Sequence, residues 1–400
     1  MKTFLAAALG AALALCAQTR TVTDAEVMRV HRSTLLIDTH NDVPSRTVEG
    51  FDLGSRSGTG HTDIARLKEG GVGAQFFAVY VGASYVNGNH SANRTLQMID
   101  TVRHDIIERY PGDFVFAASA KDIEDAHRRG KIAALMGIEG GHAIEDSLRL
   151  LRDYYDLGVR YMTLTHTNTN NWADSSGDIN NTSVKHHNGL TGFGRDVVRE
   201  MNRLGMMVDI SHVADKTFWD ALEVSKAPIF ASHSSSRAIT NHARNMTDEM
   251  IVALARKGGV VQVNFYCGFI SQKFRDNDAA DQRALDARLA KENPGKTLSE
   301  PDLQVLTEKL RKEMGLTRAT LSDVVAHIDH IRKIAGIDAI GIGGDFDGVS
   351  CTPEGLDDVS KYPSLTRALL EKGYSAEDIR KIYGGNFLRV MRAVEAAAGK

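Results

Sequence analysis

The run Ile132-Ala-Ala-Leu-Met-Gly-Ile-Glu139 decides the fold that we expect, because it is apolar at almost every position until a carboxylate closes it. Such unbroken apolarity is typical of a parallel strand that is covered on both faces. Seven similar runs lie at 35–40, 72–81, 160–166, 206–212, 228–233, 259–266 and 339–345. Eight strands that alternate with helices predict one α/β domain, a (β/α)8 barrel of the TIM type.

Segments with helical spacing of apolar residues separate these runs, at 94–110, 148–157, 194–204, 248–257 and 321–335. A doubly wound open sheet is the alternative, but no glycine-rich dinucleotide loop follows the first run. Residues 271–316 break the rhythm with a charged stretch that includes Lys291-Glu-Asn-Pro-Gly-Lys296. We expect a helical insertion between strands seven and eight. This insertion is either a lid over the site or a solvated surface insertion, and a run of charges such as this one favours the solvated surface.

Composition and the amino terminus bear on partners and location. The 400 residues carry a formal net charge of -3, which argues against nucleic-acid binding and favours small-molecule chemistry.

Residues 1–17 have the cationic start, apolar run and small residues of a signal peptide. We therefore expect one exported domain over 18–400, periplasmic or extracellular, with no stable membrane anchor. Cys16 suggests lipoprotein processing, but Leu15 stands where such a site needs a small residue. Cys267 and Cys351 could pair or stay free.

Metal-capable side chains close six of the eight runs. They are His40, Glu139, His166, His212, His233 and Asp345. The carboxyl ends of barrel strands meet at one rim, where barrel enzymes place their chemistry. A single histidine at such an end is usually structural, but burying several ionisable groups together without a metal costs many kcal/mol. The set therefore predicts a metal site.

The spacing of these side chains suggests two cation sites. Alternate residues of an extended chain point the same way, so His40 and Asp42 can bind one cation. His212 and His233 close successive strands and can bind a second. Glu139 has two carboxylate oxygens and can bridge both cations. A ligand set of carboxylates and imidazoles without thiolate fits Zn²⁺ best, although Mn²⁺, Co²⁺ or Ni²⁺ can take similar geometry.

Two such ions predict hydrolytic chemistry. Cations about 3.5–4 Å apart hold a water between them and lower its pKa toward ~7, which provides a bridging hydroxide as nucleophile. Asp345, within Gly341-Ile-Gly-Gly-Asp-Phe-Asp-Gly348, is expected to receive the proton of this water and return it to the leaving amine. A calcium loop built from Asp345 and Asp347 is the alternative, but it lacks the twelve-residue ligand spacing.

These segments together resemble the membrane dipeptidase (renal dipeptidase) family of zinc peptidases, within the amidohydrolase-like barrels. The resemblance spans residues 38–394 and rests on an ordered set of segments: Ile37-Asp-Thr-His-Asn-Asp-Val-Pro44, Gly137-Ile-Glu-Gly-Gly-His142, Arg160-Tyr-Met-Thr-Leu-Thr-His166, Trp172-Ala-Asp174, Ser232-His-Ser-Ser235, Gly343-Gly-Asp-Phe-Asp-Gly348 and Asp358-Val-Ser-Lys-Tyr-Pro363. It implies two zinc ions per subunit, held by the five ligands above and bridged by Glu139.

The resemblance also implies roles for further residues. His166 would contact the scissile carbonyl and stabilise the tetrahedral intermediate, and Asp345 would be the acid/base. Arg244, in Ala243-Arg-Asn-Met246, would bind the terminal carboxylate of the substrate, and Tyr266 would line the pocket.

The activity that the resemblance implies is hydrolysis of dipeptides, with tolerance of a D-residue at the carboxyl-terminal position, by a chain that can form a non-covalent homodimer. Two alternatives stay open from the residues alone. One is a metal-dependent hydrolase of N-acyl amino acids, lactones or cyclic amides such as β-lactams. The other is an exported binding protein without catalysis.

Overall fold

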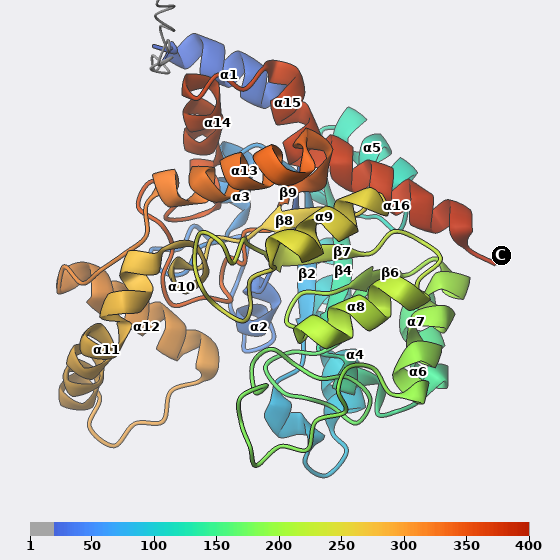
Figure 1. Cartoon of the computed structure of the whole chain (residues 1–400). Helices are drawn as coiled ribbons and strands as arrows, with labels where there is room; N and C mark the ends of the chain where they lie inside the picture. Colours follow the sequence, from blue (N-terminus) through green and yellow to red (C-terminus); the bar gives the residue numbers. More distant parts are fainter. Residues whose placement is uncertain (1–19, 400) are drawn as a thin grey trace, which may run out of the picture.

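Eight parallel strands form a nearly closed barrel in the computed structural model, which describes residues 20–399 (Figure 1). In order around the barrel they are β1 (Leu36–Asn41), β2 (Val72–Tyr80), β4 (Ile132–Glu139), β5 (Val159–Thr163), β6 (Met207–Asp209), β7 (Phe230–Ser234), β8 (Val260–Val263) and β9 (Ile340–Ile342). The predicted barrel is therefore confirmed. A further short strand, β3 (Phe114–Phe116), pairs with the start of β4 and was not predicted.

Helices surround the barrel (Figure 1). They are α1 (Asp24–Arg32), α2 (Val43–Thr47), α3 (Ile64–Glu69), α4 (Ser91–Asp100) with its π-helical continuation η2 (Thr101–Glu108), α5 (Ala120–Arg128), α6 (Leu148–Asp156), α7 (Gly192–Leu204), α8 (Asp215–Val224), α9 (Asp248–Arg256), α10 (Cys267–Ile270), α11 (Gln272–Glu292), α12 (Glu300–Glu313), α13 (Leu321–Ala335), α14 (Tyr362–Glu371), α15 (Ala376–Arg380) and α16 (Asn386–Ala397). Hydroxyl side chains cap several starts: Ser147 accepts from the N–H of Leu150, and Thr191 from that of Gly194. All five predicted helices are present.

Backbone contacts between the first and last strands close the barrel rim. The N–H of Asp42 donates to the carbonyl of Phe346 at 2.8 Å, and that of Asp345 donates to the carbonyl of His40 at 3.1 Å. Asp42 and Asp345 are 303 positions apart in the sequence, and these two bonds bring them to the same edge of the rim.

Aromatic rings fill the barrel interior below the rim. The ring centroid of Tyr161 lies 5.3 Å from that of Phe76 and 5.5 Å from that of Phe230. Phe387 of α16 packs 5.3 Å from Phe76 and belongs to the same buried cluster. The interior is thus a packed core, and open space is left at the rim.

The predicted insertion, residues 271–316, lies between β8 and β9 and consists of α11 and α12, which the short helix α10 precedes. Two features fasten it to the barrel. Cys267 and Cys351 form a buried disulfide, with Cα atoms 5.5 Å apart, which settles the question left open by the sequence. Glu308 of α12 contacts the ring of His61 and accepts from the hydroxyl of Thr352 at 2.6 Å.

The interpretation of the insertion as merely solvated surface was wrong. The first turn of α12 lines the cavity above the rim, through Glu300, Pro301 and Gln304. The charged composition misled because most of α11 is exposed, whereas Pro301 in the first turn of α12 is buried and Gln304 is partly buried.

The signal peptide expected over residues 1–17, together with Cys16, lies outside the described residues. Among the helices of residues 20–399, none has both the length and the apolarity that a membrane crossing requires.

Candidate metal centre and substrate pocket

The predicted ligands all lie at the carboxyl-terminal rim of the barrel. His40 and His233 lie within β1 and β7, and Glu139 is the last residue of β4. His166, His212 and Asp345 follow the ends of β5, β6 and β9, so those strands end earlier than predicted.

Left-handed backbone explains two of these early ends. His212 has φ of 67° and Asp345 has φ of 62°, a conformation that breaks strand pairing and costs about 1–3 kcal/mol per residue. Hydrogen bonds hold the turn at His212, since its carbonyl accepts from the N–H and the hydroxyl of Ser176 at 2.8 and 2.9 Å. Such strain is concentrated at functional sites.

One oxygen of Glu139 is the centre of the cluster. Oε1 lies 2.9 Å from Nε2 of His212, 3.2 Å from Nε2 of His233 and 3.5 Å from Nε2 of His40. Nε2 of His40 lies 3.3 Å from Oδ2 of Asp42, and the Nε2 atoms of His212 and His233 are 3.0 Å apart. The structure therefore brings together all five predicted metal ligands.

These separations fit ligands around metal ions. Donor atoms placed 2.0–2.1 Å from a tetrahedral zinc ion lie about 3.3 Å apart, and the distances above scatter around that value. Nε2 of His40 and Oδ2 of Asp42 are buried and have no hydrogen-bond partner among residues 20–399. Because orphaned buried polar atoms are costly, a cation between them is the simplest means of satisfying both.

Donor atoms within 4.8 Å of one another form three groups. They are His40, Asp42 and Glu139; Glu139, His166 and His212; and His40, His233 and Asp345. The first two groups share Glu139, which is the arrangement of a binuclear centre. The second group contains His166, to which the sequence analysis assigned substrate contact. Its imidazole therefore lies close enough to Glu139 and His212 either to bind a metal ion or to contact a substrate held there.

The electrostatics of the cluster also call for cations. Burial alone would raise the pKa of Glu139, but His40 and His166 hold it well below its ordinary value. Burial raises the pKa of Asp345 well above its ordinary value, and the negative charges of Asp42 and Glu139 add to this effect. Burial lowers the pKa values of His212 and His233 well below normal, which favours the neutral imidazoles that metals bind.

Hydrogen bonds behind the ligands fix the orientation of two rings. Nδ1 of His40 lies 2.8 Å from the hydroxyl of Tyr161, and Nδ1 of His233 lies 2.8 Å from that of Ser232. The Ser232 hydroxyl donates in turn to Asp209 at 2.6 Å. Partners of this kind direct Nε2 toward a metal.

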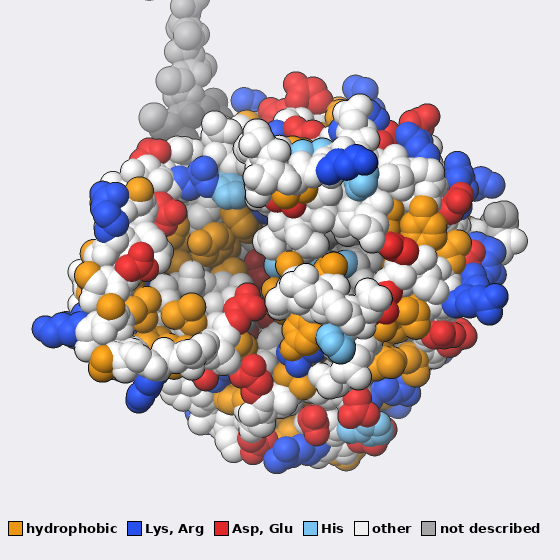
Figure 2. All heavy atoms as spheres, turned by 90° about the horizontal axis from the view of Figure 1, so that it is seen from below, with side chains coloured by type: hydrophobic (Ala, Val, Ile, Leu, Met, Phe, Trp, Pro, Cys, Tyr) orange, Lys and Arg blue, Asp and Glu red, His pale blue; other side chains and the backbone are white. Residues whose placement is uncertain are grey.

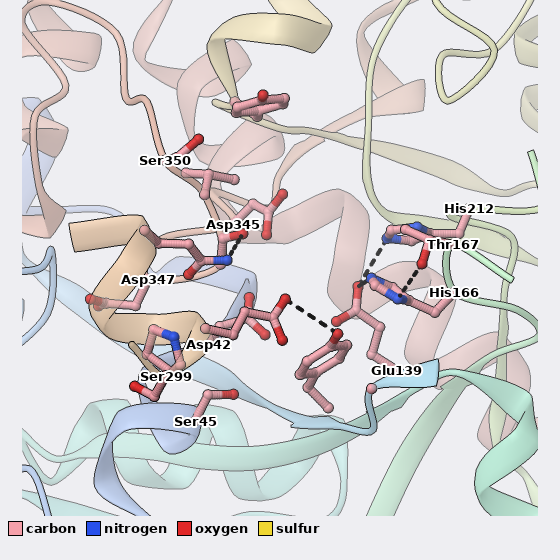
Figure 3. Close-up of a pocket in the computed structure, with 18 of the residues that line it drawn as sticks. Asp42, Ser45, Glu139, His166, Thr167, His212, Ser299, Asp345, Asp347 and Ser350 are labelled. Carbon is pink, nitrogen blue, oxygen red and sulfur yellow. Dashed lines mark hydrogen bonds and ion pairs between the residues drawn. The ribbon is translucent and has the colours of Figure 1, made fainter. Parts of the chain in front are cut away.

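A cavity of about 470 Å³ opens above this cluster, within the roughly 300–1,000 Å³ range of small-molecule sites. Figure 2 shows this face of the molecule, which is hollowed near its centre, with acidic side chains and histidine at the edges. Asp42, Glu139, His166, His212, Asp345 and Tyr266 line the cavity, so Tyr266 lies in the pocket as predicted. In Figure 3, Glu139 and His212 are on one side of the space and Asp345 and Asp347 are on the other.

The sequence did not single out several residues that line the cavity, including Tyr80, Arg94, Phe269 and Glu300. Tyr80 ends β2 and lies in register with Glu139, and its ring centroid is 4.9 Å from that of His166. Its place at the end of an apolar run, next to a ligand-bearing strand, was the signal that could have identified it. Glu300 had no such signal, because it stands in a charged stretch.

Arg244 is buried close to the metal ligands but is not among the residues that line the cavity. Its Nη2 donates to the carbonyl of His233 at 2.7 Å, while Nε has no partner among residues 20–399. Burial lowers the pKa of Arg244 to about 10, so the side chain remains a cation at neutral pH. Its role in carboxylate binding stays a prediction.

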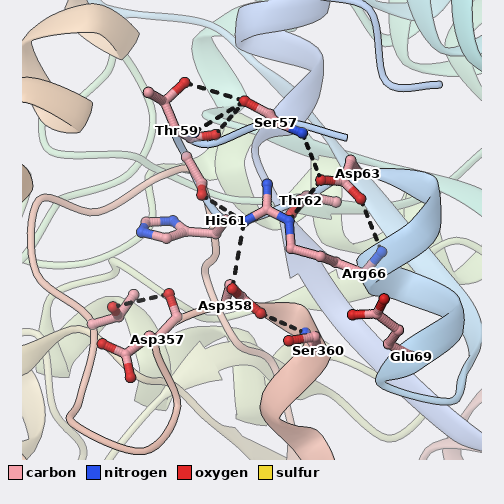
Figure 4. Close-up of polar contacts among 12 residues, drawn as sticks. Ser57, Thr59, His61, Thr62, Asp63, Arg66, Glu69, Asp357, Asp358 and Ser360 are labelled. Atoms are coloured by element: carbon pink, nitrogen blue, oxygen red, sulfur yellow. Dashed lines mark hydrogen bonds and ion pairs between the residues drawn. The ribbon is translucent and has the colours of Figure 1, made fainter. Parts of the chain in front are cut away.

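A second polar network surrounds Arg66, away from the metal ligands (Figure 4). Arg66 of α3 donates to Asp63 at 2.7 Å and lies 3.5 Å from Asp358. It thereby joins the loop before α3 to the segment before α14. The backbone N–H of His61, in that loop, donates to Oδ1 of Asp347 at 2.9 Å, so the network also steadies the turn that carries Asp345.

Comparisons with known proteins agree with this geometry. Residues 24–400 match the family described as membrane dipeptidase, peptidase family M19. The probable dipeptidase PvdM from Pseudomonas aeruginosa is 25% identical with a TM-score of 0.77, over 94% of this chain and 99% of that one. A metallopeptidase from Rhodobacter sphaeroides, solved with a phosphinate mimic of the dipeptide L-Ala-D-Ala, is 26% identical with a TM-score of 0.72, over 90% and 99%. A dipeptidase named AC, of family M19, is also 26% identical with a TM-score of 0.72, over 92% and 100%.

Proposed function

Because the chain belongs to the membrane dipeptidase family of metallopeptidases, we propose that it is a zinc enzyme that hydrolyses the peptide bond of small dipeptides. The observation that carries the proposal is the pair of ligand groups sharing Glu139 at the floor of a cavity of about 470 Å³. His40 and Asp42 would hold one ion, His212 and His233 the other, and Glu139 both. Bound there, the ions supply a water of lowered pKa and polarise the substrate carbonyl.

Asp345 moves the proton in this proposal. Its buried carboxyl has a raised pKa and faces the cavity, so it can take a proton from the attacking water and return it to the leaving amine. Asn264 donates to Oδ2 of Asp345 at 3.1 Å and holds the carboxyl in place.

His166 stabilises the negative charge that develops on the scissile carbonyl oxygen. Burial lowers the pKa of His166 to about 4, so its imidazole is neutral at pH 7. The Thr167 hydroxyl lies 3.2 Å from its Nδ1 (Figure 3). A hydroxyl that donates there leaves the ring proton on Nε2, the atom nearer to Glu139, as an oxyanion donor requires.

Arg244 binds the terminal carboxylate of the substrate, and Tyr266 lines the cavity. The phosphinate mimic of L-Ala-D-Ala in the Rhodobacter sphaeroides relative supports substrates that have a D-residue at the carboxyl-terminal position.

Purified protein should release amino acids from a panel of dipeptides, and a chelator should abolish this release. The matched comparison is one dipeptide against its carboxyl-terminal amide, which lacks the charge that Arg244 would bind. Absence of chelator-sensitive release would refute the proposal. Equal turnover of dipeptide and amide would favour N-acyl amino acids, lactones or cyclic amides as substrates.

We also propose that the protein works outside the cytoplasm, in the periplasm or beyond the cell. The disulfide between Cys267 and Cys351 supports this location, because such bonds persist in oxidising compartments. Fractionation of cells that produce the full chain tests the location.

A further inference from the structure

A carboxylate of the insertion faces the substrate pocket without a cationic partner. Glu300 is the first residue of α12 and lines the cavity. Among the described residues, its Oε1 accepts only a long hydrogen bond of 3.5 Å, from the hydroxyl of Tyr80. Within residues 20–399, no lysine, arginine or histidine nitrogen lies within 4.0 Å of its carboxylate.

Arg94 is the single lysine or arginine among the described residues that line the cavity, and its charge acts on Glu300 only at a distance. Arg94 lies over the ring of Tyr85, at 5.5 Å from the centroid, and forms no ion pair with Glu300 among the described residues. Burial raises the pKa of Glu300 and the charges of Asp42 and Glu139 raise it further, while the more weakly acting Tyr80 hydroxyl and Arg94 charge lower it. A positive group in the pocket would therefore gain more from Glu300 than from an already paired acid.

The place of Glu300 indicates which end of a dipeptide it meets. Tyr80 connects it to the side of the cavity where His166 lies, since the two rings are 4.9 Å apart. Arg244 is buried and does not line the cavity, and its Nη2 donates to the carbonyl of His233 in β7. A dipeptide whose carboxylate is directed toward Arg244 has its amino-terminal residue free to extend toward the insertion.

We propose that Glu300, oriented by Tyr80, binds a positive charge on the amino-terminal residue of the substrate and thereby sets substrate preference. This inference rests on the proposed dipeptidase function. The charge has two possible sources, the α-ammonium group or the side chain of lysine, and the same carboxylate chemistry serves both.

Three dipeptides distinguish these sources: Ala-Ala, Lys-Ala and norleucyl-Ala, which matches the length of lysine without its charge. The test variant is Glu300→Gln. The control is Glu313→Gln, which removes the same charge from the exposed far end of α12, where Glu313 lies 3.8 Å from Lys309.

We expect Glu300→Gln to raise KM, with little change in kcat, and to lower kcat/KM about 10-fold, as loss of a partly exposed charged hydrogen bond does. A loss confined to Lys-Ala assigns the site to the side chain, and an equal loss for all three substrates assigns it to the α-ammonium group. Values within twofold of the wild type for every substrate, or the same loss in Glu313→Gln, would overturn the proposal.

Binding provides a readout that does not depend on turnover. Calorimetric titration of Lys-Ala and norleucyl-Ala into metal-loaded Asp345→Asn protein measures binding without hydrolysis. Adding Glu300→Gln should weaken the binding of Lys-Ala alone if the lysine side chain is bound, and of both dipeptides equally if the α-ammonium group is bound. If the wild type hydrolyses no dipeptide, the proposed function fails. In that case this titration alone tests the Glu300 site, and equal affinities with and without Glu300→Gln would reject the proposal that Glu300 binds a positive charge.

Discussion

Replacing Asp345 by asparagine should separate proton transfer from metal binding. Asp345 has φ of 62°, and asparagine is among the few non-glycine residues that adopt this region readily. The amide can also keep an oxygen facing Nδ2 of Asn264, now 3.1 Å from Oδ2. The variant should therefore fold normally and retain the shape of the rim.

The expected loss follows from what the amide cannot do. The raised pKa of Asp345, caused first by burial, makes its carboxylate a better proton acceptor than an ordinary aspartate. An amide does not accept a proton in this way, so we expect kcat to fall by about 10²–10⁴-fold, equivalent to about 3–5 kcal/mol of transition-state stabilisation.

The assay measures amino-acid release from Ala-Ala alongside elemental analysis of the same protein. Asp347→Asn is the matched control, because Asp347 also lines the cavity with a left-handed φ of 63°. Its Oδ1 is already occupied by Arg46 and by the backbone of His61, so its loss of kcat should stay below about 10-fold, as for a positioning contact. Full metal content with unchanged kcat in Asp345→Asn would refute the role of this residue.

Three further outcomes follow from the structure. Glu139→Gln should reduce the metal content found by elemental analysis from two ions to one or none, because the shared oxygen loses its charge; two ions in this variant would contradict bridging. Glu308→Gln should lower the free energy of unfolding in urea by about 3–5 kcal/mol between pH 4.5 and 6.5, the ordinary pKa values of Glu308 and His61. Burial opposes both charges, but each partner outweighs it, lowering the pKa of Glu308 and raising that of His61. The stabilisation from Glu308 should therefore be lost only as pH falls through its lowered pKa, and that from His61 only as pH rises through its raised pKa. A stability difference independent of pH would argue against the pair. A Cys267→Ala, Cys351→Ala double variant should lose about 4.5 kcal/mol, as the chain-entropy relation gives for a separation of 84 residues; unfolding at the wild-type urea midpoint would show that the bond is absent or without effect.

The eight barrel strands could be predicted because parallel strands are buried on both faces and leave unbroken apolar runs. All eight residues of β4 are buried. The ligands followed from the same pattern, since a charged residue that closes such a run is expected at the rim. The ends of β6 and β9 could not be predicted, because the left-handed turns at His212 and Asp345 depend on contacts with distant segments.

The part of the pocket that would hold the amino-terminal residue of the substrate could not be predicted from the sequence, for a different reason. Contacts between distant segments hold α12, and with it Glu300, against the barrel, and one of them joins Glu308 to His61, 247 positions away. No local pattern encodes a contact over that distance. Pairing of Cys267 with Cys351 was likewise undecided until the fold brought their Cα atoms to 5.5 Å.

The disulfide has a consequence for how the enzyme survives proteases. Residues 294–297, between α11 and α12, are exposed, which makes them a natural place for cleavage. Because Cys267 precedes this segment and Cys351 follows it, a chain cut there stays covalently joined. The two pieces would separate on an electrophoresis gel only after reduction, and the nicked protein would keep Glu300 and Asp345 on one fragment and all five proposed metal ligands on its tethered companion.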